Sequence, residues 1–389
     1  MDLDSKLPDV GTTIFTVMSK MAADHQAINL GQGFPDFNTD PKLLELVQEA
    51  MNSGHNQYPY MPGVEPLRST IADKVQTLYR HSYNKDTEIT ITSGATEALM
   101  ASILASVHNG DEVIVIDPCY DSYVPAIRLA GGRPVRVNMI APSNTTETFY
   151  VNWADVQAAI TQNTRLIILN FPHNPTGTTL TNDDLDQIES LVDGTDILLI
   201  SDEVYEHIVF APEEHLSLAS RPKLADRAFV ISSFGKTTHT TGWKVGYCCA
   251  PQPLTQELRK VHQFLVFTVP SPFQYALANY TRDPATYLNL PQFYQAKRDR
   301  LAAGLANTRF NAYPCPGTFF MLADYSDISN ISETDFAVWL TQEHGVTVIP
   351  VSAFYADPSA EASNHQLIRF CFAKTDEMLD SAINLLSKV

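Results

Sequence analysis

The segment Ala228-Phe-Val-Ile-Ser-Ser-Phe-Gly-Lys236 joins an uninterrupted apolar run to a glycine and a lysine. Three similar runs precede it: Glu112-Val-Ile-Val-Ile116, Arg165-Leu-Ile-Ile-Leu-Asn170 and Ile197-Leu-Leu-Ile-Ser201. Runs that are apolar throughout, in contrast to alternating ones, indicate strands buried on both faces and hence a mostly parallel sheet covered by helices. Residues 96–107, with small and aliphatic side chains and no helix breaker, are predicted to form one of these helices.

The sequence pattern changes after about residue 275, where helical segments begin to frame short strands. The predicted helices cover residues 295–306, 333–344 and 376–388, and the predicted strands cover residues 318–322 and 366–371. We therefore expect a large α/β domain over residues 41–275 and a smaller α+β domain over residues 276–389 that closes on it. Residues 1–40 are expected to pack with the small domain.

The composition limits the class of protein. Of 389 residues, 44% are hydrophobic and 18% are charged, so the chain can bury a sizeable core. The net charge of −18 argues against nucleic acid as a partner, because a phosphate backbone would be repelled. Five cysteines without CxxC spacing favour a reducing cytoplasm. Because we find neither a signal-peptide pattern nor a membrane-spanning stretch, we expect a cytoplasmic protein with no membrane partner.

Each of the four apolar runs is followed by polar or aromatic residues near a tight turn. These strand exits read Asp117-Pro-Cys-Tyr120, Asn170-Phe-Pro-His-Asn-Pro-Thr-Gly177, Asp202-Glu-Val-Tyr205 and Ser233-Phe-Gly-Lys236. In parallel α/β sheets, ligands bind outside the carboxyl ends of the strands. A single exit of this kind carries little information, but four in succession predict one cleft at one edge of the sheet.

Lys236 stands directly after a buried strand, where an ordinary solvated lysine is less expected. A lysine that is partly desolvated near other cations has a lowered pKa and becomes a usable amine nucleophile. Three other motifs fail on their second requirement. A P-loop ending at Gly235-Lys-Thr237 would need a glycine where Val230 stands. A dinucleotide fingerprint starting at Gly31 would need a glycine at Asp36, and the SxxK motif of acyl-serine enzymes lacks its SDN and KTG partners.

A larger set of motifs, unlike the three single ones, meets all the requirements of one family. The order Asn174-Pro-Thr-Gly177, Asp202-x-x-Tyr205, Ser233-x-x-Lys236 and then Lys244 resembles the class I aminotransferases of the fold type I pyridoxal-phosphate enzymes. The resemblance runs from about residue 29 to residue 369, nearly the whole chain. It implies a mostly parallel central sheet sandwiched by helices, a smaller α+β domain, and pyridoxal 5′-phosphate as cofactor.

Three further segments are similar to the branch that holds the bacterial methionine aminotransferases and the kynurenine and glutamine transaminases. They are Gly31-Gln-Gly-Phe-Pro-Asp36, Thr92-Ser-Gly-Ala-Thr-Glu-Ala-Leu99 and Thr241-Gly-Trp-Lys-Val-Gly246. Many aminotransferases carry arginine at the position of Lys244. Lysine keeps the charge but loses the bidentate fork, and this departure matches the kynurenine-transaminase branch.

The resemblance assigns roles around the cofactor ring. Lys236 is implied to hold the cofactor as a Schiff base and to move protons as general acid and base. Asp202 would keep the ring nitrogen protonated. A capping or solvated aspartate is the alternative, and the placement at a strand exit, three residues before Tyr205, favours the cofactor role. Asn174 and Tyr205 match donors to the phenolic oxygen of the ring, and Tyr120 is expected to lie over the ring.

The resemblance also implies which residues bind the phosphate of the cofactor. The free N–H groups and the dipole at the start of the predicted helix favour a dianion there. The implied phosphate contacts are Gly94, Ala95, Thr96, Ser233 and Lys244. Tyr58 matches a tyrosine that reaches the phosphate from the other subunit, which implies a homodimer with shared active sites. No metal ligands are assigned.

Substrate recognition is predicted from a planar double donor and an apolar wall. Arg369 matches the family residue that binds the substrate carboxylate, with help from the backbone of Gly33. Phe15, Tyr60 and Phe267 are candidate wall residues, Phe267 as a candidate from the partner subunit, and each could equally be a core residue. With Asn174, the candidate substrate contacts are Gly33, Asn174, Arg369, Phe15, Tyr60 and Phe267.

The resemblance implies a ping-pong transamination with L-amino acids and 2-oxo acids as substrates. Methionine and aromatic amino acids such as phenylalanine, tyrosine, histidine or kynurenine are the expected donors. A carbon–sulfur β-lyase of the cysteine-conjugate or cystathionine type is the alternative. Both reactions would use Lys236, and they differ in which substrate bond aligns with the π system of the ring, which a sequence does not reveal.

Overall fold

The computed structural model describes residues 4–389. Its central element is a seven-stranded sheet with the order β2-β8-β7-β6-β5-β3-β4. Strands β3 to β7 run parallel to one another, whereas β8 is antiparallel to both β2 and β7. The mostly parallel sheet predicted from the apolar runs is therefore confirmed. The strands are β2 (Ile89–Thr92), β3 (Glu112–Asp117), β4 (Arg133–Asn138), β5 (Thr164–Asn170), β6 (Leu198–Asp202), β7 (Ala228–Ser233) and β8 (Gly246–Cys249).

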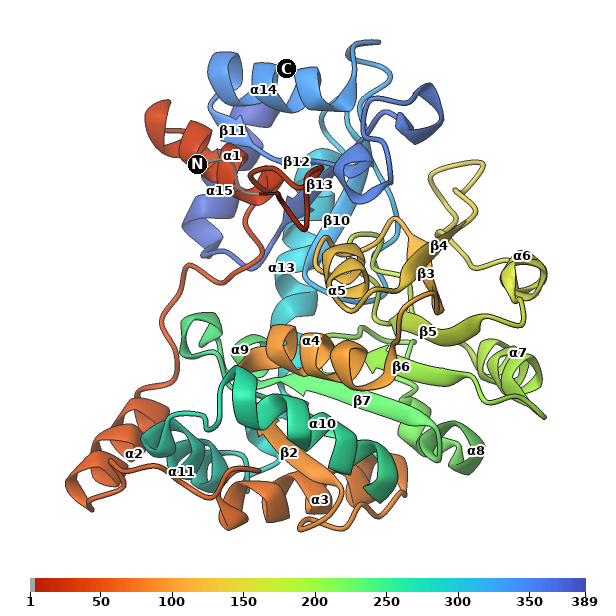
Figure 1. The fold of residues 1–389 in the computed structure, drawn as a ribbon. Coiled ribbons are helices and arrows are strands. Elements are labelled where there is room, and N and C mark those ends of the chain that lie inside the picture. The colour runs from red at the N-terminus through yellow and green to blue at the C-terminus, as the bar shows by residue number, and fades with distance from the viewer. Residues whose placement is uncertain (1–3) are drawn as a thin grey trace.

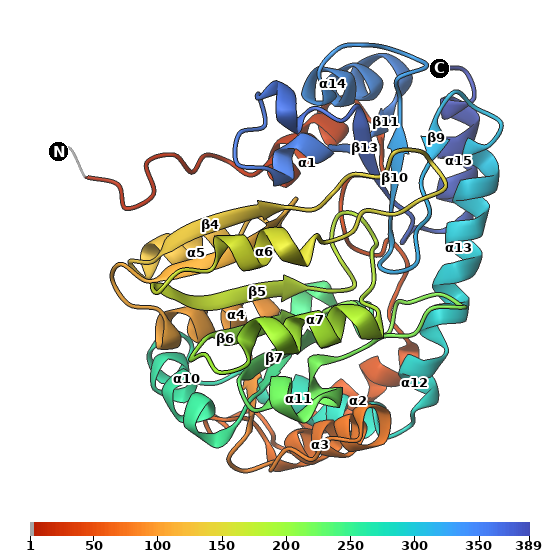
Figure 2. The ribbon, with the colours of Figure 1, turned by 90° about the vertical axis from the view of Figure 1, so that its right-hand side faces the viewer.

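Helices cover both faces of this sheet, which explains why its strands lack alternation. In β3, Val113 and Val115 belong to one buried cluster, and Ile114 and Ile116 belong to another. Helices α4, α5 and α10 cover the first face, and α6 and α7 lie on the opposite one (Figures 1 and 2). The helices packed around the large sheet are α2 (Pro41–Asn52), α3 (Glu65–Tyr79), α4 (Gly94–Ser106), α5 (Tyr123–Leu129), α6 (Trp153–Ala159), α7 (Asn182–Val192), α8 (Pro222–Ala225), α10 (Gln252–Leu265) and α11 (Ser271–Tyr280).

A second, smaller part of the molecule is built around an antiparallel sheet with the order β12-β13-β10-β9. Its strands are β9 (Asn311–Ala312), β10 (Phe320–Asp324), β12 (Ile349–Pro350) and β13 (Leu367–Cys371). Its helices are α13 (Leu290–Leu305), α14 (Glu333–His344) and α15 (Asp376–Leu386), and the short α12 (Ala285–Leu288) precedes them. None of the helices within residues 4–389 combines the length and the apolar character that a membrane crossing requires.

The N-terminal elements lie against the C-terminal part of the chain. Strand β1 (Ile28–Asn29) pairs in parallel with β11 (Val346–Thr347), and helix α1 (Ile14–Asp24) contacts β11, β12 and α14. Helix α2, by contrast, packs on α11 next to the large sheet. The domain boundaries at residues 40 and 275 stay a prediction.

Most predicted elements exist, with shifted ends. Helix α13 begins at Leu290 and not at residue 295, because Pro291 fits the first turn of a helix, where its missing N–H is no loss. Strand β10 begins at Phe320 and not at residue 318, because Thr318 has a φ of +65° and the chain turns there. Strand β8 was not predicted, since Gly246 and two cysteines do not form a typical apolar run.

The topology brings the candidate residues together. Parallel strands β3, β5, β6 and β7 end at the same edge of the sheet, and each of the four predicted exits follows one of them. Gly246 at the start of β8 closes this edge. A Cβ atom on Gly246 would lie 2.8 Å from the backbone nitrogen of Ala95 and 2.7 Å from the carbonyl carbon of Gly94. The start of α4 therefore rests directly on β8, beside the strand exits.

Candidate active site

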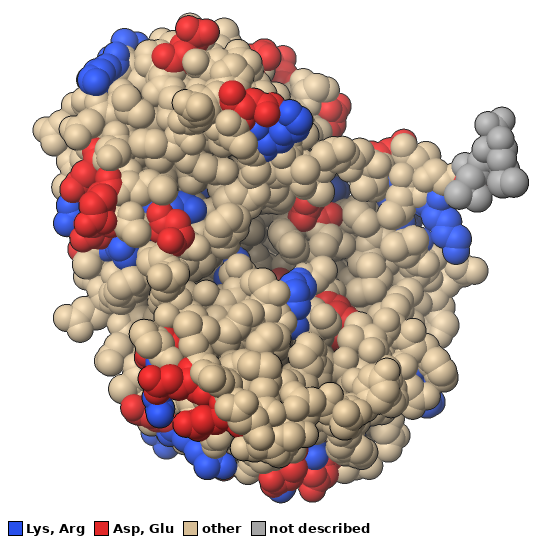
Figure 3. Space-filling model, turned by 90° about the vertical axis from the view of Figure 1, so that its left-hand side faces the viewer, with Lys and Arg blue, Asp and Glu red and all other residues tan. Residues whose placement is uncertain are grey.

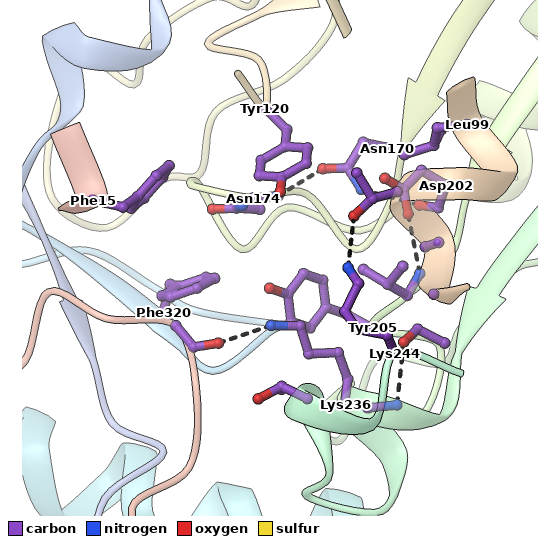
Figure 4. A pocket seen from close by; sticks show the side chains of 18 of the residues that line it. Phe15, Leu99, Tyr120, Asn170, Asn174, Asp202, Tyr205, Lys236, Lys244 and Phe320 are labelled. Carbon is purple, nitrogen blue, oxygen red and sulfur yellow. Dashed lines mark hydrogen bonds between the residues drawn. The ribbon is translucent and has the colours of Figure 1, made fainter. Parts of the chain in front are cut away.

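A cavity of about 330 Å³ lies at this edge of the sheet. Figure 3 shows one face of the molecule, which is hollowed near its centre and has acidic and basic side chains near the hollow. The cavity brings together most of the residues predicted from the sequence, and Figure 4 shows how several of them converge. Those that line it are Phe15, Gly33, Gly94, Ala95, Thr96, Tyr120, Asn174, Asp202, Tyr205, Ser233, Lys236, Lys244 and Arg369.

Lys236 lies on the short helix α9 (Phe234–Thr237), which starts where β7 ends. Its Nζ donates a hydrogen bond to the carbonyl oxygen of Gly33 over 2.8 Å. The rings of Phe319 and Tyr205 lie 5.0 Å and 5.5 Å from Nζ, so the amine is enclosed by aromatic carbon as well. Burial disfavours the charged ammonium and lowers the pKa of Lys236 to about 8. The structure therefore provides a desolvated amine of the kind expected of a nucleophile.

Asp202 is the last residue of β6 and is buried. One carboxylate oxygen accepts a hydrogen bond of 2.7 Å from the hydroxyl of Tyr123, and burial raises the pKa of Asp202 to about 6. The neighbouring Glu203 is turned away from the cavity and accepts hydrogen bonds from the ring of His215 and the backbone N–H of Leu218. Of these two adjacent carboxylates, only Asp202 faces the cavity.

The N-terminus of α4 forms the polar end of the cavity. Gly94 has a φ of +71°, a conformation that glycine adopts without strain, and the N-cap residue Ser93 makes no side-chain capping hydrogen bond. Lys244 reaches over this turn and donates to the hydroxyl of Thr96 across 3.2 Å. Ser233 stands at the same edge, where its hydroxyl accepts from the N–H of Gly235. Open helix N–H groups beside a cation make a site for an anion.

Arg369, on β13, is fully buried. Its Nη1 donates to the Oδ1 of Asn174 over 2.6 Å, and its Nη2 donates to the carbonyl oxygen of Gly31 over 3.0 Å. The ring centre of Phe320 lies only 3.7 Å from the guanidinium carbon, and that of Phe15 lies 5.3 Å away. Burial lowers the pKa of Arg369 to about 10, and its Nε has no hydrogen-bond partner among the described residues.

The remaining predicted ring contacts border the same space. Burial raises the pKa of the Tyr120 hydroxyl to about 12, so this tyrosine stays a neutral donor. Tyr205 is buried with its ring edge-on to that of Phe319, at 5.2 Å between centroids. The backbone N–H of Asn174 donates to the side chain of Asn170 over 3.1 Å, which fixes the turn that carries Asn174.

Three predicted residues do not line the cavity of their own chain. Tyr58 and Phe267 are 82% and 44% exposed, and their rings contact each other at 5.4 Å. Tyr60 is 64% exposed and lies beside the guanidinium of Arg68. For Tyr58 and Phe267, the sequence predicts a role in the active site of a partner subunit. For Tyr60 it predicts a place in the substrate wall with no mention of a partner, and the structure places Tyr60 outside the cavity of its own chain.

Sequence reasoning missed several residues that line the cavity or hold a residue that lines it. Tyr123, which holds Asp202, and Asn170, at the end of β5, both stand in or next to strand exits and could have been found there. Phe320 offers no such signal, because it reaches the cavity from the small sheet by tertiary packing. The lining residues that were not predicted are Gln32, Leu99, Asn170, Val204, Gly235, Thr241 and Phe320.

A half-buried amine, a buried carboxylate, an anion site and a buried guanidinium in one cavity are the groups that a carbonyl-bearing anionic cofactor and a carboxylate substrate require. Comparison with known proteins agrees with this class. The aminotransferase class I and II family matches residues 25–386. The chain therefore belongs to the class I and II aminotransferases, a family whose class I members depend on pyridoxal phosphate.

Individual relatives cover the chain almost completely. The methionine aminotransferase of Escherichia coli is 50% identical over 99% of this chain and 98% of its own length. The solved structure of YbdL from Escherichia coli, described as having a methionine aminotransferase function, has a TM-score of 0.96 at 49% identity and covers both chains fully. The kynurenine–oxoglutarate transaminase of Dictyostelium discoideum is 34% identical over 97% of this chain and 94% of its own length.

The lowered pKa of Lys236 makes a testable prediction. Only the neutral amine attacks a carbonyl, and in the cofactor-free protein its fraction rises as the pH increases through about 8, in contrast to 10.5 for an ordinary lysine. We expect the rate at which the cofactor-free protein reacts with an aldehyde to increase with pH with a midpoint near 8. Stopped-flow absorbance would measure it, with Nα-acetyl-lysine as the control. A midpoint near that of the free lysine would contradict the environment described for Lys236.

Proposed function

We propose that this chain binds pyridoxal 5′-phosphate on Lys236 and catalyses transamination between an apolar L-amino acid and a 2-oxo acid. The observation that carries the proposal is that the amine of Lys236, the carboxylate of Asp202 and the open N-terminus of α4 line one cavity. Its volume of about 330 Å³ falls within the range of about 300–1,000 Å³ typical of small-molecule sites.

The phosphate fits the end of the cavity formed by α4. A dianion there would receive the backbone N–H groups of Ala95 and Thr96 and the charge of Lys244. Gly94 supports this fit, because a Cβ at that position would lie 3.2 Å from the Nζ of Lys244 and would crowd the cation. Ser233 adds a hydroxyl at the same edge.

The ring fits between the amine and the carboxylate. A pyridinium nitrogen is a cationic donor, and a carboxylate such as Asp202, already held by Tyr123, would keep it protonated. Once ion-paired, Asp202 would regain an ordinary, low pKa. Asn174 and Tyr205 would donate to the phenolic oxygen of the ring, and Tyr120 would cover its face.

The cofactor, when bound, supplies an electron sink for the bond that breaks at the substrate Cα. The protein supplies the positions and the protons. Arg369 binds the substrate carboxylate and so fixes the orientation of Cα. With the cofactor bound, the Nζ of Lys236 would take the proton from Cα as a general base and would give it up again as a general acid.

The substrate preference that we propose is methionine and aromatic amino acids. Two of the cations that line the cavity, Lys236 and Lys244, are already assigned to the cofactor, and Arg369 is assigned to the α-carboxylate. Among the described residues that line it, no cation is left for a second carboxylate. Figure 4 shows Phe15 and Phe320 on the side of the cavity opposite Asp202, where they offer an apolar wall. The relatives named for methionine and kynurenine support the same preference.

Transamination is favoured over the β-lyase alternative, because the relatives reported above are named as aminotransferases. We also propose a homodimer. Tyr58 and Phe267 form an exposed aromatic pair that does not line the cavity of its own chain, and such large exposed side chains are typical of an interface. In this dimer, Tyr58 would reach the phosphate of the neighbouring site, and Phe267 and Tyr60 would border its substrate.

Removing the amine tests the central residue. We expect Lys236→Ala to lower kcat by about 10²- to 10⁴-fold or more, because the variant lacks both the attachment point and the proton carrier. After borohydride reduction, peptide mass spectrometry of the native protein should find the cofactor on Lys236. Lys223→Ala, at an exposed lysine, is the control. Native rates of 2-oxo acid production by the Lys236 variant, or attachment to another lysine, would refute the assignment.

The apolar preference is tested by comparing donors. Because no cation among the described lining residues is free for a second carboxylate, we expect kcat/KM for methionine and phenylalanine to exceed that for aspartate by about tenfold or more, a difference of about 1.4 kcal/mol. A coupled assay with a common 2-oxo acid acceptor would measure it. Aspartate as the best donor would contradict the apolar wall. Release of pyruvate and ammonia from cystathionine without an acceptor would favour the lyase.

The shared site is tested at Tyr58. A hydroxyl that donates to a charged phosphate is worth about 1.5–3 kcal/mol, so we expect Tyr58→Phe to raise the Kd for pyridoxal phosphate by about tenfold or more. Fluorescence titration of the cofactor-free protein would measure it, with the exposed Tyr150→Phe as control. Sedimentation should give twice the chain mass of 43.2 kDa. A fully active monomer, or an unchanged Kd, would argue against a shared site.

A further inference from the structure

We propose that Gln32 is a positioning residue that sets substrate specificity. Its side-chain amide holds Phe15 in place, and through Phe15 it holds the apolar wall of the substrate cavity. The inference rests on the proposed function, because it assumes that Phe15 faces the side chain of an apolar amino donor. Both residues line the cavity, and they come from separate segments of the N-terminal region.

Phe15 occupies a part of α1 that needs outside support. The helix begins at Ile14, so Phe15 lies in its first turn, where the backbone N–H groups lack partners within the helix. The fully buried anchors of α1, Met18 and Ala22, come later. The N-cap Thr13 accepts the N–H of Thr16 over 3.3 Å, and beyond this cap the end of the helix that carries Phe15 is the part most free to fray.

Gln32 provides that contact. Its Nε2 donates to the carbonyl oxygen of Phe15 over 3.2 Å and to the hydroxyl of Ser19. Phe15 and Ser19 are four residues apart and so lie on the same face of α1. A carbonyl oxygen only accepts, so the nitrogen of the amide must face the helix. With both N–H groups of the amide engaged, the side chain of Gln32 is fixed in one orientation.

The backbone of Gln32 is also held by hydrogen bonds. The side-chain oxygen of Asn29 accepts the N–H groups of Gln32, over 3.1 Å, and of Gly31, over 2.9 Å. The carbonyl oxygen of Gly31 in turn accepts from Arg369. The residue proposed to bind the substrate carboxylate is therefore linked to Phe15 through a short path of hydrogen bonds and backbone, with Gln32 in the middle.

This path has a consequence for selectivity. The ring of Phe15 stands 5.3 Å from the guanidinium of Arg369 and packs edge-on against Phe354 at 5.8 Å. A donor with a long apolar side chain gains binding free energy from a wall held at a fixed distance from its carboxylate. Alanine, whose side chain is a methyl group, gains little. If Phe15 is held less firmly, kcat/KM should therefore fall more for methionine than for alanine.

The test uses Gln32→Glu, which keeps the size of the side chain but removes both N–H donors and turns a carboxylate toward the carbonyl of Phe15. We expect the ratio of kcat/KM for methionine to that for alanine to fall by about tenfold. Phe15→Ala should lower the same ratio, and the double variant should lower it no further than Phe15→Ala alone, because both changes act through one wall. Val17→Ala, on the exposed side of α1, is the matched control and should keep the native ratio.

A measurement without turnover accompanies the kinetics. In the cofactor-free protein, we expect the amides of residues 17–19, which pair with carbonyls at the start of α1, to exchange hydrogen faster in Gln32→Glu than in the native chain, while exchange in the second half of the helix is unchanged. An unchanged methionine-to-alanine ratio, an equal loss for both donors, or additive effects in the double variant would overturn the proposal, as would unaltered exchange. If the native enzyme itself fails to prefer methionine over alanine, the proposed function fails first, and the two failures are thereby distinguished.

Discussion

One buried charge, the guanidinium of Arg369, connects the three regions that enclose the cavity. It lies on the small sheet, donates to Asn174 at an exit of the large sheet, and donates to Gly31 in the N-terminal loop. Burying a charge is costly unless hydrogen bonds compensate. Here two neutral acceptors and the face of Phe320 compensate in part, and within residues 4–389 no carboxylate forms an ion pair with the group. The fold thus holds a buried cation with neutral acceptors, as the proposed binding of a substrate carboxylate requires.

A second buried network supports the site from behind. Glu206 follows Tyr205 in the chain and accepts hydrogen bonds from Lys74, at 2.6 Å, from Ser232, at 2.6 Å, and from the hydroxyl of Tyr247, at 2.8 Å. The carboxylate therefore ties the exit of β6 to the ends of β7 and β8, and its charge is compensated by Lys74. A buried ion pair is stable only when its remaining lone pairs are also satisfied, and this one meets that condition. These hydrogen bonds hold the turn that carries Tyr205 in place.

The parts of the fold and the site that could be predicted are those in which a local pattern has a long-range consequence. Uniformly apolar runs require burial on both faces, and parallel strands require their carboxyl ends to meet, so the exits carrying Asn174, Asp202 and Lys236 were found together. The pairing of β8 between β2 and β7 could not be predicted, because a short strand that contains glycine carries no such pattern. Phe320 and Gln32 were missed because they approach the cavity through tertiary contacts that no spacing encodes.

The cavity concentrates positive charge in a chain that is acidic as a whole. The chain carries a net charge of −18, yet Lys236, Lys244 and Arg369 line one cavity together with the N-terminus of α4. After burial itself, the charge of Arg369 and the charge of Lys244 are among the causes that lower the pKa of Lys236. Three mutually repelling cations in a partly dry cavity destabilise the ligand-free fold, and bound anions relieve the repulsion. If an anionic cofactor and a carboxylate substrate bind here as proposed, they restore this stability, which is the trade-off expected of a preorganised active site.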